Sequence, residues 1–177
     1  MLYFIADTHF GDPKIIPYKH RPFASLDDMT EKMIVNWNNV VKDDIIFVLG
    51  DLSFYDLEHT KDIVNRLNGT KFLIKGNHDI FSIDEYKSCG FIDVFEDTRD
   101  FNIEDEQNPT LILSHKPEDT EYFNIHGHIH DDPLEKSYPN LNKKNHFCVS
   151  VEMTDYKPIS WEEIKNKIKG DNKDDKF

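Results

Sequence analysis

The sequence has few cysteines, no long apolar segment and too few basic residues to balance its acidic ones. The two cysteines, Cys89 and Cys148, form no Cys-x-x-Cys motif, and two in 177 residues do not make a disulfide framework. We interpret both as reduced packing residues. No apolar run approaches the ~20 residues of a membrane span, and the run before Asp7 is too short for the core of a signal peptide. These absences predict a soluble, cytoplasmic protein with no membrane partner.

Acidic residues number 34 against 21 basic ones, and the net charge is −13. A field of this sign repels phosphate, so extended nucleic acid is not an expected partner. Any anionic substrate has to be attracted locally, and bound divalent metal ions would reverse the sign at their own site. The length fits one domain, which we place at residues 1–169, followed by a frayed polar tail at 170–177.

Several short apolar runs end directly in residues that bind metals or protons. Such runs are typical of strands, and polar residues at their carboxyl ends are typical of a site at the edge of a sheet. One Asp or Asn after a strand is usually an ordinary turn, but the repetition indicates a shared site. The runs are 2–6, 45–49, 72–74, 111–113 and 122–125.

Helical patterns alternate with the first three of these runs. Ser25 is a predicted N-cap for a helix ending near Val41, and a second helix is predicted at 56–67. Strand, helix and strand in succession predict a largely parallel sheet with right-handed crossovers. A capping box of Ser160 and Glu163 predicts a last helix, with Gly170 as its end. Further predictions are a loop over the site at 10–23, a helix at 81–88, strands at 91–95, 99–103 and 147–151, a turn at 104–109 and a long loop at 131–144.

The polar motifs resemble those of the calcineurin-like metallophosphoesterase superfamily, in the same order. They are Asp-x-His at 7–9, Gly-Asp at 50–51, Gly-Asn-His-Asp at 76–79, a lone histidine at 115 and Gly-His-x-His at 127–130. The chain looks most like the small, single-domain prokaryotic members. The resemblance implies an α/β fold, a four-layer αββα sandwich of two mixed β-sheets flanked by helices. It also implies an enzyme that hydrolyses a small phosphate ester with two divalent metal ions, from among Mn, Fe, Ni, Zn and Mg.

The resemblance assigns the metal ligands. Asp51 bridges the two ions, Asp7, His9 and His130 complete the first site, and Asn77, His115 and His128 complete the second. A bridging carboxylate holds two cations together, while neutral ligands leave enough positive charge to bind phosphate, and a bridging hydroxide is the implied nucleophile. We expect His128 and His130 to point the same way, because residues two apart do so in an extended chain.

The remaining polar residues have separate expected roles. His78 is the predicted general acid, and Asp79 is expected to orient and charge its ring. His126 lies outside the family motif, so packing or a hydrogen bond to a ligand is expected. Candidates for contact with the substrate phosphate are His20, Arg21 and Lys116, for which solvated charge is an equal alternative.

Residues 52–54 lack the Asp-Arg pair that marks the serine/threonine protein phosphatases, which makes phosphoprotein phosphatase activity less favoured. A phosphodiester is favoured over a monoester because no dedicated monoester clamp is visible. A catalytically silent metal-binding scaffold is the alternative from another class, and the presence of His78 in a complete motif set argues against it. A phosphomonoesterase and a nuclease remain further alternatives, and the net charge disfavours the nuclease.

Overall fold

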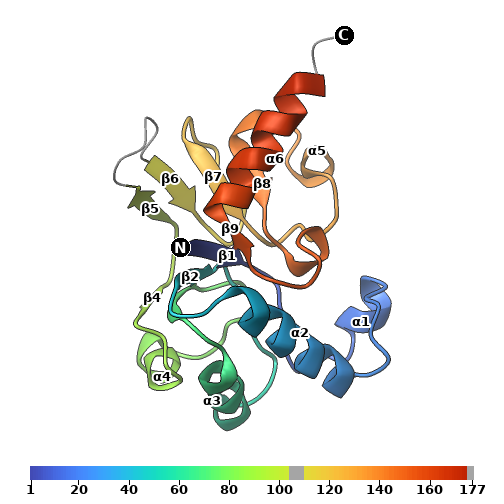
Figure 1. The fold of residues 1–177 in the computed structure, drawn as a ribbon, viewed down its shortest axis with the longest axis vertical. Coiled ribbons are helices and arrows are strands. Elements are labelled where there is room, and N and C mark those ends of the chain that lie inside the picture. The colour runs from blue at the N-terminus through green and yellow to red at the C-terminus, as the bar shows by residue number, and fades with distance from the viewer. Residues whose placement is uncertain (104–109, 175–177) are drawn as a thin grey trace.

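The computed structural model of the protein describes residues 1–103 and 110–174, with side chains up to residue 169 (Figure 1). The turn predicted at 104–109 lies outside the described residues. No helix in the described part of the chain is both long and apolar enough to cross a membrane.

The first sheet is parallel except for one edge strand. Its strand order is β4-β3-β2-β1-β9, and the strands are β1 (Leu2–Ile5), β2 (Ile45–Val48), β3 (Thr70–Ile74), β4 (Asp93–Phe95) and the antiparallel β9 (Ile159–Ser160). Three helices connect the parallel strands and lie on one side of this sheet (Figure 1). They are α2 (Leu26–Val40), α3 (Leu57–Arg66) and α4 (Ile83–Ser88).

The second sheet has the order β5-β6-β7-β8. Its strands are β5 (Arg99–Asn102), β6 (Thr110–Leu113), β7 (Phe123–His126) and β8 (His146–Cys148). Only β5 runs antiparallel to its neighbour, so this sheet is also mixed. Two mixed sheets flanked by helices confirm the predicted α/β sandwich.

The central strands bury both faces, which explains their nearly continuous apolar sequences. Along β1, Tyr3 and Ile5 pack into the core under the helices, whereas Phe4 packs into the core between the two sheets. Leu111 and Ile125 contribute to that second core from the facing sheet. A shift of one residue in the strand pairing would exchange these two faces. Burial in the two cores therefore fixes the register of each strand, and with it the position of the strand's carboxyl end.

The last helix, α6 (Trp161–Asp174), begins where the capping box predicts. Ser160 Oγ accepts the N–H of Glu163, whose Oε2 accepts the N–H of Ser160 in return. The predicted helix end at Gly170 is wrong because the helix continues to Asp174. A glycine within a helix costs only about 1 kcal/mol relative to alanine, so it does not by itself stop a helix.

Three other segments differ from their predicted structure. The strand expected at 147–151 ends at Cys148, and the chain then turns into a 3-10 helix, η2 (Val151–Met153). The loop at 10–23 contains the short helix α1 (Ile15–Tyr18), and the loop at 131–144 contains α5 (Leu134–Ser137) and the start of η1 (Lys143–Asn145). The turn after β8 brings Ser150 to Asp7 and Glu152 to His130.

Candidate metal centre

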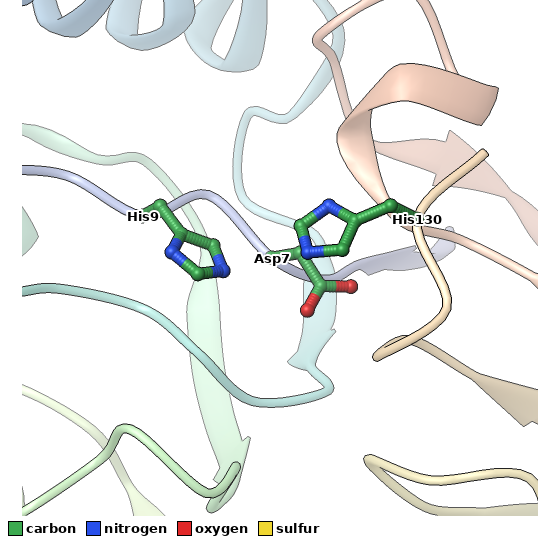
Figure 2. A group of neighbouring side chains, drawn as sticks. All are labelled: Asp7, His9 and His130. Atoms are coloured by element: carbon green, nitrogen blue, oxygen red, sulfur yellow. The ribbon is translucent and has the colours of Figure 1, made fainter. Parts of the chain in front are cut away.

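The seven predicted metal ligands meet at the carboxyl ends of the strands of both sheets. The ligand atoms of Asp7, His9 and His130 all lie within 4.8 Å of one another, as do those of Asp7, Asp51 and His115. Figure 2 shows the first of these groups, in which two imidazole rings and one carboxylate share a small space. Asp7 therefore belongs to both groups, and together they form one continuous cluster.

The other two predicted ligands contact the second group. His115 Nε2 lies 3.0 Å from Asn77 Oδ1 and 3.2 Å from His128 Nδ1. Asp51 spans the cluster, because its Oδ2 lies 3.6 Å from Nε2 of His9 and 3.6 Å from Nε2 of His115. All seven side chains that the sequence singled out are thus brought together.

Three buried polar atoms at the centre of the cluster have no hydrogen-bond partner. They are Asp7 Oδ1 and both ring nitrogens of His9, although His9 Nδ1 lies 3.4 Å from Asp12 Oδ2. Leaving such an atom buried and unpaired costs about 1–3 kcal/mol, so folded proteins rarely do it. Carboxylate oxygens and imidazole nitrogens are common donors to divalent transition metals. The residues present therefore fit a bound cation.

Each carboxylate uses one oxygen for the protein and presents the other to the cluster. Asp7 Oδ2 accepts hydrogen bonds from the N–H of His128 at 2.9 Å and from Ser150 Oγ at 2.5 Å. Asp51 Oδ1 accepts the N–H of His78 at 2.9 Å. The other two oxygens, Asp7 Oδ1 and Asp51 Oδ2, are consequently held in place and face the cluster without accepting these hydrogen bonds.

Two of the histidines are oriented through the ring nitrogen that faces away from the cluster. His115 Nδ1 lies 2.9 Å from the carbonyl oxygen of Leu49, and His130 Nδ1 lies 3.0 Å from Glu152 Oε2. A hydrogen on Nδ1 leaves the Nε2 lone pair free for a metal, which is how ligating histidines are usually fixed.

Arg21 was a candidate for binding substrate phosphate, and the structure contradicts this. Its side chain is fully buried and donates to Glu152 Oε1 at 2.7 and 2.9 Å and to the carbonyl oxygens of Asp7 and Thr8. These four bonds tie the loop after β1 to the glutamate that orients His130, and a fifth contact goes to Met29 Sδ at 3.5 Å. The guanidinium is out of reach of a substrate.

Glu152 and Ser150 are functional residues that the sequence reasoning missed. Both follow β8 directly, as the recognised ligands follow their own strands, and that position was the available signal. Neither belongs to a Gly-His or Gly-Asp pair. Their roles therefore became visible only through contacts with His130 and Asp7, respectively 22 and 143 positions away in sequence.

The ligands sit on an unusual backbone. Asp7, His9, Asp51, His128 and His130 all have a positive φ, between 50° and 70°. This left-handed region is uncommon for residues other than glycine and is concentrated at functional sites. The extended conformation expected for His128 and His130 is thus wrong, because the chain turns tightly with the N–H of Ile129 bonded to the carbonyl of Gly127 at 2.9 Å.

Two motif glycines are required because atoms of the predicted ligands Asp51 and Asp7 lie too close to the position that a Cβ would occupy. A Cβ on Gly76 would lie 2.5 Å from the Asp51 nitrogen and even closer to its carboxylate. A Cβ on Gly127 would lie 2.6 Å from Asp7 Oδ2. The glycines of these motifs therefore allow the close approach of the two metal-facing carboxylates.

Asp79 does not orient His78 as expected. Its carboxylate accepts the backbone N–H groups of Gly76, Asp51 and Leu52 at 2.7–3.0 Å. Tyr86 adds a fourth bond through its hydroxyl at 3.1 Å. These four bonds use the carboxylate fully, and no hydrogen bond to the His78 ring is present among the described residues. Asp79 instead fastens the loop after β2 to the loop after β3.

His78 lies at the open side of the cluster. Its side chain is 47% exposed, and its Nε2 is 3.9 Å from Asp51 Oδ2. The ring centroid lies 4.9 Å from that of Phe54 and 5.7 Å from that of His9. His78 is therefore accessible to a substrate from a position next to the ligands.

Burial adjusts the protonation of the cluster. Burial lowers the pKa of His9 to about 2, with help from the neighbouring His130 and Arg21, and lowers that of His128 to about 4. Both rings are neutral at pH 7 and hence ready to bind a cation.

His126 is buried outside the cluster, and burial lowers its pKa to about 4. Its Nδ1 bonds the carbonyl oxygen of Gly127 at 2.9 Å, so of the two expected roles the buried ring shows packing and not a hydrogen bond to a ligand.

Lys116 and His20 differ in their relation to the site. Lys116 is exposed and lines a hollow of about 260 Å³ together with Asn77 and His115. His20 is exposed after α1, and no contact with a ligand is present in the part of the chain that the structure describes. Lys116 is therefore the better placed of the two for a substrate phosphate.

Comparison with known proteins agrees with this site. The family model described as calcineurin-like phosphoesterase matches residues 1–176. An uncharacterized protein of Methanocaldococcus jannaschii is 36% identical over 168 residues, which cover 90% of this chain and 86% of that protein. The crystal structure of a protein of unknown function from Aquifex aeolicus is similar with a TM-score of 0.71 and 28% identity, over 94% of this chain and 98% of that one. Neither description names a substrate.

Proposed function

The chain belongs to the calcineurin-like phosphoesterase family, and on that premise we propose that it hydrolyses small phosphodiesters with two divalent metal ions. The main support is the set of buried, unpaired donor atoms on Asp7 and His9, which a cation would satisfy. The overlap of two ligand groups in one cluster supports two ions over one.

In this proposal Asp51 is the shared ligand. Its Oδ2 is equally distant from His9 and from His115, one imidazole of each group. Asp7, and not Asp51, is the residue that the two three-residue groups share, but we assign it to the first ion because it lies with His9 and His130. Asn77, His115 and His128 then complete the second site.

When bound, two ions at such a site supply a nucleophilic water of lowered pKa and neutralise charge on the phosphate. The chain itself contributes the position of the substrate and a proton. His78 is exposed beside the cluster and can hold a proton at Nε2 for the departing oxygen. Lys116, which lines the hollow beside Asn77 and His115, is available for a phosphate oxygen.

The preference for a diester rests on what surrounds the cluster. A clamp for the extra charge of a monoester is missing from the described residues, since Arg21 is buried in its pair with Glu152. Two hollows instead border the ligands, one of about 260 Å³ beside Asn77 and His115 and one of about 300 Å³ beside His128 and His130. Two hollows suit the two ester groups of a diester.

The test is hydrolysis of bis-p-nitrophenyl phosphate and p-nitrophenyl phosphate with Mn, Ni, Mg or Fe, alongside metal analysis of the protein. We expect two ions per chain, a higher kcat/KM for the diester, loss of activity with chelator and a higher Tm with Mn. Activity that survives the chelator would contradict the proposal. Two bound ions without hydrolysis of any ester would instead indicate a silent scaffold.

Ligand variants test the sharing of Asp51. Asp51→Asn should weaken both ions together, whereas Asn77→Ala should weaken one, because an amide oxygen serves a single ion. Asp62→Asn, an exposed carboxylate on α3, is the matched control and should keep both. Two tightly bound ions in Asp51→Asn would remove the bridging assignment.

A further inference from the structure

The hollow beside His128 and His130 has a different chemical character from the hollow beside Asn77. It measures about 300 Å³, and its inner wall consists of those two predicted ligands. The outer wall is formed by side chains from α1, α5 and the residues around them. They are Tyr18, Lys19, Ile129, Asp132, Ser137 and Tyr138.

The charged residues of this hollow are already paired. Lys19 Nζ lies 2.9 Å from Asp131 Oδ1 and 2.9 Å from Asp132 Oδ2. Its ammonium is therefore neutralised, and it offers no strong attraction for a second anionic group. The same ion pairs tie the end of α1 to the loop before α5, which brings Tyr18 to the hollow that Tyr138 also lines.

Two tyrosine rings are the groups of this hollow that remain for a ligand beside the paired charges. Tyr18 is 72% exposed, and Lys19 Nζ lies 5.5 Å from the centroid of its ring, which leaves much of the ring accessible to a ligand. Tyr138 and Ile129 complete the apolar lining, and the hydroxyl of Ser137 adds one polar contact. Aromatic walls of this type bind flat rings by stacking, and each stacked base contributes strongly to affinity.

The hollow beside Asn77 provides the contrast. It contains Lys116, which has no ion-pair partner in the described part of the chain, and it contains the acidic side chains of Glu96, Asp97 and Glu118. The hollow beside Asn77 thus contains Lys116, whereas the hollow beside His128 and His130 contains two tyrosines and a lysine that is already paired. A substrate with two different ester groups fits this asymmetry.

We propose that the hollow lined by Tyr18 and Tyr138 binds a planar aromatic ester group of the substrate, of which a nucleobase is the natural example. The inference rests on the proposed phosphoesterase function and deepens it by assigning a substrate class. A phosphate at the cluster places the group that it carries beside His128 and His130, at the entrance of this hollow.

The experiment measures binding separately from hydrolysis. Dissociation constants of adenosine 5′-monophosphate, phenyl phosphate and ribose 5-phosphate are measured by calorimetry on the Mn-loaded protein, with released phosphate assayed to verify that the ligands stay intact. Because adenosine 5′-monophosphate and ribose 5-phosphate differ only in the base, we expect the nucleotide to bind about tenfold more tightly. Phenyl phosphate shows whether any flat ring suffices or a nucleobase is needed.

Variants locate the effect. Tyr18→Ala and Tyr138→Leu should remove most of the preference for the ring-bearing ligands, whereas Tyr138→Phe, which retains the ring, should preserve it. Tyr122→Leu, at an exposed tyrosine outside this hollow, is the control. Unfolding curves of each variant verify that the fold is intact, and Tyr138→Phe separates loss of stacking from loss of structure.

Equal affinity for the nucleotide and ribose 5-phosphate would overturn the inference, as would a preference that persists in both Tyr18→Ala and Tyr138→Leu. Ring preference without hydrolysis of any ester would overturn the proposed function and leave this subsite in place. Hydrolysis of diesters without ring preference would do the reverse. The two proposals can therefore fail independently.

Discussion

His78, the proposed general acid, is positioned by its own backbone. Its N–H donates to Asp51 Oδ1, so the residue is fixed beside the cluster while its ring stays accessible. Phe54 packs against the ring and against that of His9, which limits the directions in which His78 can turn. The ring can therefore approach a leaving group without binding the ions.

We expect His78→Ala to lower kcat by about 10²–10⁴-fold with both metal ions retained, because a positioned general acid contributes that much. The loss should be smaller for p-nitrophenolate, which leaves without a proton, than for an alkoxide. The measurement is kcat across diesters with leaving groups of different pKa, together with metal content.

His59→Ala is the matched control for this prediction, since His59 is an exposed histidine on α3 that pairs with Asp56. It should leave kcat unchanged. An equal loss for all leaving groups in His78→Ala, or the loss of a metal ion with activity, would make His78 a ligand or a packing residue.

At the scale of elements, the site consists of loops that follow different strands. Individual side chains connect one loop to another. Asp79 joins the loop after β2 to the loop after β3 through three backbone N–H groups. Arg21 and Glu152 join the loop after β1 to the loop after β7, through His130. These contacts position the ligands without binding the ions.

We expect Asp79→Asn to destabilise the metal-free protein by about 1–3 kcal/mol, because an amide nitrogen would then face a backbone N–H. The variant should also bind both ions more weakly, since the loops of Asp51 and Asn77 both lose their anchor. The free energy of unfolding in urea and the metal affinity are the measurements.

Tyr86→Phe removes only the hydroxyl bond to Asp79 and should have the smaller effect. If Asp79→Asn kept its stability and metal affinity but lost activity mainly toward poor leaving groups, Asp79 would act through His78 after all.

At the scale of the whole molecule, the protein concentrates its buried titratable groups around one end of the two sheets. The unfolded chain solvates these groups, so their altered pKa values make stability depend on pH. His126 gives the clearest case, because its ring is buried and its pKa is lowered to about 4.

The sign follows from proton binding. Between pH 6.5 and about 4 the unfolded state binds a proton at His126 that the folded state does not, so its contribution to stability falls as the pH falls through that range. For such a shift the loss between pH 7 and 5 is about 2 kcal/mol.

We therefore expect the loss of unfolding free energy between pH 7 and 5 to be smaller in His126→Gln than in the wild type by about that amount. Urea unfolding in the presence of a chelator measures the difference without a contribution from metal ions. His20→Gln, at an exposed histidine outside the cluster, is the control. A pH dependence in His126→Gln identical to that of the wild type would contradict the prediction.

Short stretches of sequence were enough to predict much of the fold and of the candidate site. The polar motifs follow apolar runs, and their resemblance to a known family implied the seven candidate ligands, His78 and the two mixed sheets. Helix starts such as Ser25 and Ser160 are equally local, because a cap depends on residues three positions away.

Only the tertiary structure decided the partners of the remaining polar groups. Arg21 has the sequence character of a phosphate-binding residue, and its burial against Glu152 depends on a contact across 131 positions. Asp79 adjoins His78 in sequence yet bonds to the backbone around Asp51, and the turn at His128 and His130 replaces the extended chain. A side chain's type limits what it can bind, but the choice among possible partners is made by segments distant in sequence that pack side by side.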